Sequence, residues 1–311
     1  MILEVTEKEY MRRMGEAPHF FISEEFVNLN INKVDRIIRL IEDKPKVNLG
    51  LVVGLKNNIL LSPFSAPFGG FHIRNQDIYI SEIENFLFEL EEYMTKEKIS
   101  KFCVTLPPFL YQQSFNSKLI NVLIRIGYKI NIPEITNWIP LVEFNGEYGN
   151  RKSKEYYRQA VKNNLKFYKI TDELLKQNAF SLIENNRKKF NRPIYMTFQD
   201  LKNMEAIVPV DYFIVVDANE NILSSGIFYR FNNEIVYAVF WGDNELGRPL
   251  RAMDFLIYNL ITFYKNEENK FIDLGISTES GIPNEGLLRF KETHESLSSL
   301  RYSFEWTNNL L

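Results

Sequence analysis

Residues 269–277 read NKFIDLGIS, and this stretch decides the fold because it has a counterpart earlier in the chain. Residues 100–108 read SKFCVTLPP. Both stretches have Lys-Phe followed by a short apolar run typical of a buried strand, and both follow an amphipathic segment with helical spacing. The recurrence predicts that one order of elements occurs twice.

Working outward from residues 100–108, the first copy is predicted to begin with a hairpin over residues 46–64, with its turn at Lys56-Asn57-Asn58. Ser81 and Glu84 have the spacing of a capping box, which predicts a helix over residues 81–97. A second helix is expected over residues 114–126, ended by Gly127, and one or two strands over residues 128–142. A further helix is expected near residues 34–41.

Working outward from residues 269–277, the second copy repeats this order. A hairpin is predicted over residues 211–231, a third strand over 232–242, and a helix over 251–265 with Pro249 in its first turn. Asn284 is expected to cap a helix over residues 284–294, and a strand follows over 301–306. A strand, a helix and a returning strand imply parallel pairing with a right-handed connection.

The predicted fold class is therefore α/β, with two tandem units that each have a mixed, twisted sheet flanked by helices. Residues 145–150, NGEYGN, have the composition of a linker. We place the boundary there, with one domain over residues 1–148 and the other over 149–311.

The composition excludes several classes of function. The only cysteine is Cys103, so no disulfide forms within the chain, which fits a reducing compartment and predicts a cytoplasmic protein. No run approaches the roughly 20 apolar residues of a membrane-spanning helix, and no signal peptide is evident. The three histidines are far apart and no metal-binding motif is present, so no metal is expected. Walker, dinucleotide and serine-hydrolase motifs are also missing.

Residues 151–170 are basic although the chain carries a net charge of -3, and a second basic cluster follows at residues 187–192. Three interpretations remain open for the first segment. It is a solvated helix face, a surface that steers an anionic substrate, or a patch for aminoacyl-tRNA. We rank the solvated face first and tRNA last.

Two late stretches, Asp273-Leu274-Gly275 and Gly286-Leu287-Leu288-Arg289-Phe290-Lys291, together with the tandem units and the basic segment, resemble the Fem-type branch of the GNAT superfamily. Members of this branch are double-GNAT N-acyltransferases of cell-wall and cell-surface synthesis. The resemblance implies transfer of an acyl or aminoacyl group to an amine, with acyl-CoA or aminoacyl-tRNA as donor. It also implies that Lys291 meets a phosphate or carboxylate of the acceptor, and an ordinary exposed lysine on a helix is the alternative interpretation.

The resemblance places the donor between the third strand and the helix of the second unit. The residues there depart from the GNAT phosphate loop, since only Gly247 and Ala252 match it. We nevertheless expect the donor to be bound by this segment, because free N–H groups and arginines favour an anion. The expected residues are Trp241, Asn244, Gly247, Arg248, Leu250 and Arg251.

The same resemblance implies that two parallel strands separate, and that donor and acceptor meet where Trp241-Gly242 and Ile276-Ser277 end them. An amine attacks a thioester or ester directly, so the protein need only orient both, stabilise the oxyanion and accept a proton. A backbone N–H near Trp241 is a candidate for the oxyanion. The candidate proton acceptors are Asp243, Asp273 and Glu279, and a surface carboxylate is the alternative interpretation of each.

The run SPFSAPFGGF, residues 62–71, has two interpretations. Its glycines allow a ligand to approach the backbone, with Gly69, Gly70 and His72 as substrate-binding candidates alongside Ser277. Alternatively it is a stiff bend whose phenylalanines fill the seam between the predicted units, and we rank this interpretation slightly above phosphate binding. The runner-up function is of another class: a duplicated fold without catalysis that binds a ligand or partner.

Overall fold

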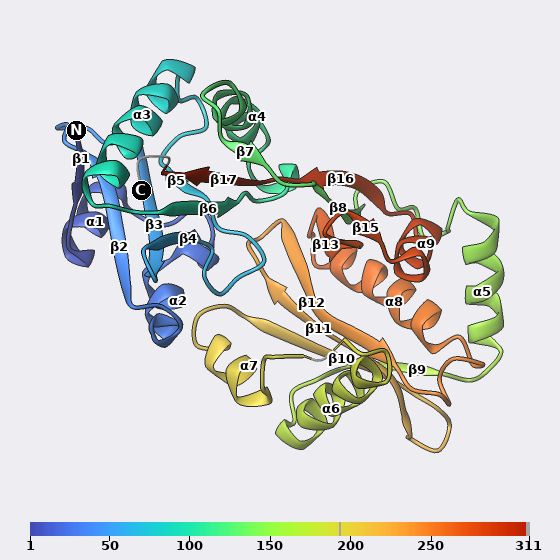
Figure 1. Cartoon of the computed structure of the whole chain (residues 1–311). Coiled ribbons are helices and arrows are strands. Elements are labelled where there is room, and N and C mark those ends of the chain that lie inside the picture. The colour runs from blue at the N-terminus through green and yellow to red at the C-terminus, as the bar shows by residue number, and fades with distance from the viewer. Residues whose placement is uncertain (193, 309–311) are drawn as a thin grey trace. The chain divides into compact units, whose positions relative to one another are not determined.

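The computed structural model describes residues 1–192 and 194–308, and it divides into two compact units (Figure 1). Unit 1 consists of residues 1–135 with the C-terminal residues 299–311, and unit 2 consists of residues 136–298. The chain crosses from one unit to the other within β8 and again within β16.

Unit 1 is built on a mixed sheet whose strands run in the order β1-β2-β3-β4-β6-β17-β7, with β5 also paired to β3. Apolar faces of its helices cover a core that includes Phe86, Leu90, Phe102 and Leu119. The strands are β1 Ile2–Glu4, β2 Arg36–Glu42, β3 Leu49–Lys56, β4 Ile59–Ser62, β5 Phe71–Ile73, β6 Lys101–Thr105, β7 Lys129–Ile130 and β17 Ser303–Thr307. The α-helices are α1 Glu7–Met14, α2 Glu24–Leu29, α3 Ile80–Lys96 and α4 Phe109–Arg125.

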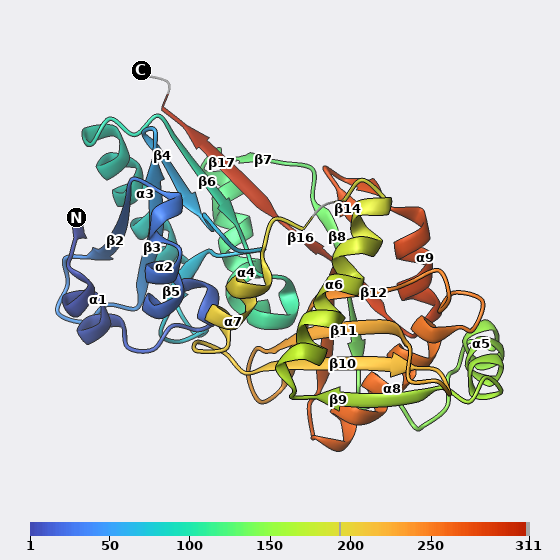
Figure 2. The ribbon, with the colours of Figure 1, turned by 90° about the horizontal axis from the view of Figure 1, so that it is seen from below.

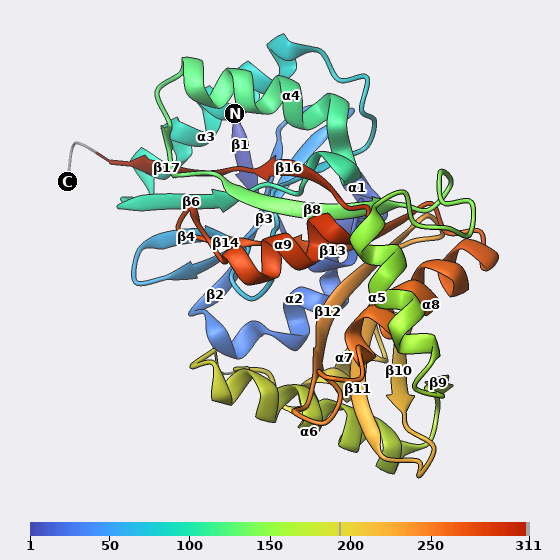
Figure 3. The same ribbon diagram turned by 90° about the vertical axis from the view of Figure 1, so that its right-hand side faces the viewer.

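Unit 2 has a sheet in the order β9-β10-β11-β12-β13-β8-β16, and Figures 2 and 3 show α6 and α8 on its opposite faces. Helix α5 packs beside α8. The strands are β8 Glu134–Pro140, β9 Lys166–Ile170, β10 Val210–Val216, β11 Ile222–Arg230, β12 Ile235–Asp243, β13 Phe271–Ile276 and β16 Leu297–Arg301, with a small hairpin of β14 Thr278–Glu279 and β15 Ile282–Pro283. The helices are α5 Arg151–Val161, α6 Glu173–Lys189, α7 Phe198–Met204, α8 Ala252–Asn266 and α9 Glu285–Thr293.

The predicted repeat is confirmed by the two sheets, whose strands correspond position by position. Residues 100–108 and 269–277, whose similarity revealed the repeat, contain β6 and β13. Strand β6 pairs in parallel with β4, and β13 pairs in parallel with β12. Each sheet also contains a strand from the opposite part of the sequence. The C-terminal β17 lies between β6 and β7, and β8 lies between β13 and β16.

This exchange of strands explains why the structure differs from the predicted division at residue 148. β8 belongs to the sheet of unit 2 although it precedes that boundary, and β17 completes unit 1 although it ends the chain. Linker-like composition identifies a loop but carries no information about which sheet a neighbouring strand joins.

Two further predictions about local structure are wrong. Residues 36–42 form β2 rather than a helix. The apolar residues at 37, 38, 40 and 41 fit a helical period, but β2 pairs with β1 and β3, and residues 38, 40 and 41 are buried. The helix predicted over residues 81–97 is present as α3, but its predicted capping box is wrong, because Glu82 rather than Glu84 accepts the N–H of Tyr79 at the helix start. Within the described residues, no helix is long and apolar enough to cross a membrane.

Candidate functional site

Strands β12 and β13 separate as they leave the centre of the unit 2 sheet. They pair in parallel only where Ile235–Tyr237 lies beside Phe271–Asp273. Beyond this point Gly275 and Ile276 pair with β8, while β12 continues along β11 as far as Asp243. The space between the diverging strands is the one that the sequence predicts for the donor and the acceptor.

Strand β12 has a β-bulge beside this separation. Ile227 of β11 lies opposite Phe240 and Phe228 lies opposite Ala238, so Val239 is the extra residue on β12. A bulge interrupts the regular ladder of hydrogen bonds and changes the direction of neighbouring backbone groups. The bulge at Val239 therefore lies two residues before Trp241, the position predicted for the oxyanion donor.

A pocket of about 500 Å³ lies at the end of β12, where the strand meets the starts of α8 and α9. It brings together Trp241, Asp243, Arg248 and Arg251 of the predicted site. The other lining residues come from β12, from α6 and the residue after it, and from α8 and α9, and they are Gly242, Asn186, Phe190, Ala252, Met253, Asp254, Gly286, Leu287 and Phe290.

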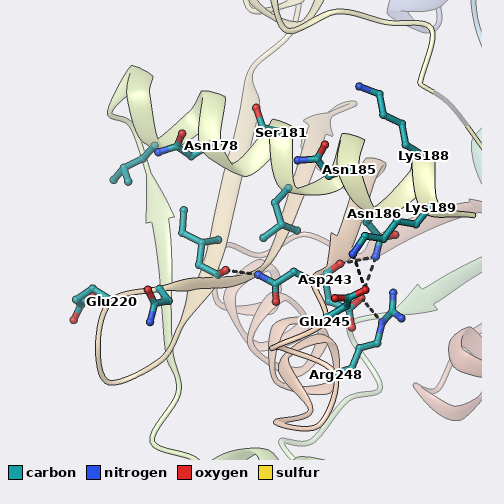
Figure 4. Close-up of a pocket in the computed structure, with 15 residues that line it drawn as sticks. Asn178, Ser181, Asn185, Asn186, Lys188, Lys189, Glu220, Asp243, Glu245 and Arg248 are labelled. Carbon is teal, nitrogen blue, oxygen red and sulfur yellow. Dashed lines mark hydrogen bonds and ion pairs between the residues drawn. The ribbon is translucent and has the colours of Figure 1, made fainter.

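Asp243 lies at the boundary between this pocket and a second one of about 910 Å³ along α6, which Figure 4 shows. Its Oδ1 accepts a hydrogen bond from Asn186 Nδ2 at 3.2 Å and an ion-pair contact from Arg248 Nε at 3.3 Å. Burial raises the pKa of Asp243, and Arg248 partly opposes this. Of the three carboxylates predicted as proton acceptors, Asp243 is the one that lines the pocket.

The loop before α8 satisfies most of its own backbone N–H groups. Asn244 accepts the N–H of Gly247 at 2.9 Å, and the N–H of Ala252 binds Gly247 O at 3.0 Å. A Cβ at Gly247 would lie 2.6 Å from Leu223 O, so only glycine fits this tight turn. The amides of Met253 and Asp254, in the first turn of α8, have no acceptor within the described chain. These two amides, rather than those of the loop, are therefore the backbone groups available to an anion at this helix start.

Two arginines, Arg248 and Arg251, provide positive charge near the start of α8. Arg248 lies over the ring of Phe190, with 5.1 Å from its guanidinium to the ring centroid, and Arg251 lies over Tyr156 at 3.8 Å. Arg251 is also the residue before α8, in a left-handed conformation with φ of 61°. Leu250, also predicted to bind the donor, packs its side chain against the core and accepts a hydrogen bond from Asn163.

A buried pair of side chains joins α8 to α9 beside the pocket. His294 Nε2 lies 3.2 Å from Asp254 Oδ1, and Nδ1 lies 2.7 Å from Phe290 O. His294 is 1% exposed, and its ring therefore lies buried between the start of α8 and the end of α9.

Lys291 is buried rather than exposed, with 1% of its surface accessible. Its Nζ donates to Gly275 O and Ile276 O, both at 2.8 Å, so it holds the end of β13. Burial lowers the pKa of Lys291 to about 7, although Asp273 opposes the shift. Asp273 is itself buried, and its Oδ1 accepts the N–H of Gly275 at 2.7 Å. Lys291 and Asp273 therefore hold the backbone at the end of β13 through buried hydrogen bonds.

Other predicted residues lie away from the pocket. Ser277 is buried and donates to Asn137 Oδ1, and Glu279 is exposed in the β14–β15 hairpin. Gly69, Gly70 and His72 belong to unit 1.

In unit 1 the glycine-rich run is a closed bend. The N–H of Gly69 binds Thr105 O at 2.9 Å, and the N–H of Gly70 binds Ser62 Oγ at 3.0 Å. A Cβ at Gly69 would lie 2.7 Å from Ser62 Oγ. His72 is buried with Nε2 2.9 Å from Glu16 O, and burial lowers its pKa to about 4. The amides of both glycines are therefore bound within unit 1, as expected for a stiff bend.

The sequence interpretation missed the contribution of α6 to the pocket. Asn186 and Phe190 end that helix and reach the pocket at the end of β12. A signal was present, because adjacent asparagines at 185 and 186 are weak helix formers in an otherwise helical segment. No group of histidine, cysteine, aspartate and glutamate among residues 1–192 and 194–308 is arranged to hold a metal ion.

The chain is similar to known proteins in its structure, but no similarity is found from its sequence. No protein-family model matches the chain, and no curated protein matches it by sequence. The structure of FemX is 11% identical with a TM-score of 0.68, covering 100% of this chain and 98% of FemX. L-PGS from Bacillus licheniformis is 11% identical with a TM-score of 0.59, covering 97% of this chain and 91% of L-PGS.

A tandem GNAT protein from the clavulanic acid biosynthesis pathway is also 11% identical, with a TM-score of 0.53 and coverage of 87% of this chain and 82% of that protein. The expected architecture of two mixed sheets, each with its own helices, is found over the whole length shared with FemX. The chain therefore has the Fem-type fold, with two GNAT-like units in tandem.

Proposed function

We propose that unit 2 transfers an acyl or aminoacyl group to an amine. The observation that carries this proposal is the separation of β12 and β13, with an open pocket of about 500 Å³ at the end of β12. In unit 1 the amides of Gly69 and Gly70 are bound by Thr105 O and Ser62 Oγ, whereas in unit 2 the amides of Met253 and Asp254 have no acceptor among the described residues. We therefore assign the reaction to unit 2.

In the proposed reaction the amine nitrogen attacks the thioester carbonyl and forms a tetrahedral oxyanion. Collapse of this species breaks the carbon–sulfur bond, forms the amide and releases the sulfur as the thiolate. Asp243 accepts the proton that the amine loses, and its raised pKa makes it a better base than an ordinary exposed aspartate. The backbone of β12 near the bulge at Val239 is the proposed hydrogen-bond donor to the oxyanion.

The proposed donor is an acyl-CoA, whose phosphates would lie against Arg248, Arg251 and the first turn of α8. Guanidinium groups bind phosphate through paired hydrogen bonds and do not depend on free loop amides. Aminoacyl-tRNA is the second donor, implied by the Fem-type resemblance. It offers the same phosphate chemistry with an ester in place of the thioester.

The amine acceptor is proposed to be an amino sugar or amino acid used in the synthesis of a surface polymer. The alternative function, a binding protein without catalysis, is supported by the internal hydrogen bonding of the loop around Gly247.

An assay of transfer separates these possibilities. The purified chain is incubated with acetyl-CoA or longer acyl-CoAs and a panel of amines, and release of free thiol is followed together with the mass of the amide. A parallel reaction uses aminoacyl-tRNA and measures loss of the ester. Amide formation with either donor supports the proposal. Binding of amines without transfer from any donor would favour the binding protein.

A further inference from the structure

A second cavity of unit 2 is not used by the proposed reaction. It is the space of about 910 Å³ along α6, and we call it the α6 groove. Figure 4 shows α6 on one side of it, with residues 220–222 and the loop that begins at Asp243 on the other. Its volume is within the range of pockets that hold small molecules in proteins.

A partition separates the α6 groove from the pocket at the end of β12. Asn186, Asp243 and Arg248 line both spaces. Asp243 Oδ1 lies 3.2 Å from Asn186 Nδ2 and 3.3 Å from Arg248 Nε, so these side chains are bonded to one another across the boundary. Trp241 lines only the pocket. A ligand in the α6 groove is therefore held apart from the place where the amide bond is proposed to form.

The charged side chains of the α6 groove compensate one another. Three of them are basic and three are acidic. Each has a partner of opposite charge in unit 2, and the pairs are Lys189–Glu245, Arg248–Asp243, Lys188–Glu184 and Glu220–Lys166. The groove therefore has no net charge from its lining, and it favours an uncharged ligand over an ion.

The polar groups that remain available in the α6 groove are uncharged. Asn178, Ser181 and Asn185 line it from one face of α6, at helical spacing. Within residues 1–192 and 194–308 their side chains have no hydrogen-bond partner, and Figure 4 draws no contact to them. Amides and hydroxyls both donate and accept hydrogen bonds. These three side chains can therefore bind a ligand that also does both.

The asparagines of α6 are not explained by the helix itself. Asparagine is a weaker helix former than alanine, glutamate or lysine, because its side chain competes for backbone hydrogen bonds. Asn186 has a structural role, since it binds Asp243. No contact within the described part of the chain gives Asn178 or Asn185 such a role. A ligand in the groove would use both amides.

The rest of the lining restricts the chemical class of this ligand. Leu175, Leu182 and Ile222 provide apolar surface beside the amides. Among the described residues no aromatic ring lines the groove, so a nucleobase finds no partner for stacking. A saccharide has hydroxyls that donate and accept, together with apolar C–H faces. It matches both kinds of surface.

We propose that the α6 groove is a second binding site, for an uncharged saccharide that does not receive the acyl group. The inference goes beyond the proposed function, because the partition at Asp243 separates this ligand from the reaction. The hydroxyls of the saccharide pair with Asn178, Ser181 and Asn185, and its C–H face lies on Leu182. In this role the groove holds the protein on a carbohydrate chain, independently of the donor.

Isothermal titration of the wild-type chain tests the ligand class. The uncharged probes are N,N′-diacetylchitobiose, cellobiose and maltotriose, none of which has a free amine. The comparison probes are glucose 6-phosphate, glucuronic acid and triglycine. At least one uncharged saccharide is expected to bind, about tenfold or more tightly than any comparison probe. Addition of acetyl-CoA should not displace it.

Two variants with the same change of side chain test the site. The double variant Asn178→Leu, Asn185→Leu removes both amides and should weaken saccharide binding by about tenfold or more. Gln177→Leu is the matched control, because Gln177 is an exposed amide on α6 that does not line the groove. It should leave the affinity unchanged. Thermal melting establishes that each variant folds.

The inference is overturned if no uncharged saccharide binds, if a comparison probe binds more tightly, if the double variant keeps the wild-type affinity, or if acetyl-CoA displaces the saccharide. The transfer assay on the same samples tests the proposed function separately. Saccharide binding without transfer from any donor would leave this inference standing while the proposed function fails.

Discussion

At the scale of single residues, the site depends on groups whose surroundings alter their chemistry. Asp243 is partly buried between Arg248 and Asn186, and burial raises its pKa. Lys291 occurs at a position that a motif comparison treats as substrate-binding, but its ammonium is used by the backbone of β13. A lysine fits both a substrate-binding role and a role in holding β13, and the burial of Lys291 distinguishes between the two.

The substitution Asp243→Asn tests the proposed base. The amide has the same shape but accepts no proton, so we expect the rate of amide formation to fall by about 10²- to 10⁴-fold. The affinity for acyl-CoA should change little, because the donor contacts are assigned to Arg248 and Arg251. Steady-state rates and donor titrations on the same samples check both. A variant that keeps the wild-type rate would exclude Asp243 as the base.

The buried Lys291 predicts a particular dependence of stability on pH. Its pKa is about 7 in the folded chain and 10.5 when unperturbed, so between these values the unfolded chain binds more protons. The free energy of unfolding should therefore rise with pH across this window, by up to roughly 1.4 kcal/mol per pH unit from this group. Below pH 7 the destabilisation is fully present.

Denaturant unfolding at several pH values between 6 and 10 measures this effect. Lys291→Met lacks the titrating group, so the difference in unfolding free energy between wild type and variant should change steadily in favour of the wild type as pH rises. Lys188→Met, at an exposed position, is the control and should run parallel to the wild type. Parallel curves for Lys291→Met would contradict the assignment.

At the scale of elements, the site is the place where three of them end. The strand β12 stops at Asp243, α8 starts after a tight loop, and α6 finishes with a left-handed turn at Asn191. The loop depends on Gly247, whose missing side chain leaves room for Leu223 O. The position of Arg248 and Arg251 relative to β12 thus follows from one turn.

The substitution Gly247→Ala is expected to move this loop. Its Cβ would lie 2.6 Å from Leu223 O, so the backbone must shift, at a cost of about 1 to 3 kcal/mol. Gly286→Ala is a suitable control for stability, because the nearest atom to its Cβ is Asn284 Oδ1 at 3.9 Å. Thermal unfolding should show a loss for Gly247→Ala and none for Gly286→Ala. Equal melting temperatures would mean that the loop is not held in this way.

At the scale of the whole molecule, the sequence was sufficient for the repeat but not for the way the units are completed. The stretches at 100–108 and 269–277 correctly predict parallel strands after a helix, since apolar runs and turn residues are local signals. The pairing of β17 with β6, or of β8 with β13, joins residues far apart in the sequence. No local pattern specifies such partners.

The same reasoning explains what was missed at the site. Trp241, Asp243, Arg248 and Arg251 are close in the sequence to the end of one strand, and the order of elements places them together. Phe190 and Asn186 reach the pocket from a helix that lies more than 50 residues earlier in the printed sequence. Their contribution depends on how α6 packs on the sheet, which its amphipathic pattern alone does not specify.

The exchange of strands predicts which fragments fold. A fragment of residues 149–311 lacks β8, which lies between β13 and β16, and should remain largely unfolded. A fragment of residues 136–298 retains most of β8 and should show a cooperative thermal transition. Circular dichroism of both fragments compares them directly. Cooperative unfolding of the 149–311 fragment would show that β8 is dispensable.

The central claim is that the pocket at the end of β12 binds the donor, and a thermal-shift titration with acetyl-CoA, free CoA and aminoacyl-tRNA tests it most directly. A donor at about 100 times its Kd should stabilise the wild-type chain by roughly 2.7 kcal/mol. The double variant Arg248→Gln, Arg251→Gln should lose most of this shift, whereas Lys188→Gln should keep it. A saturable shift that depends on the two arginines is the predicted result. No shift with any donor, or a shift of equal size in the double variant, would contradict the account.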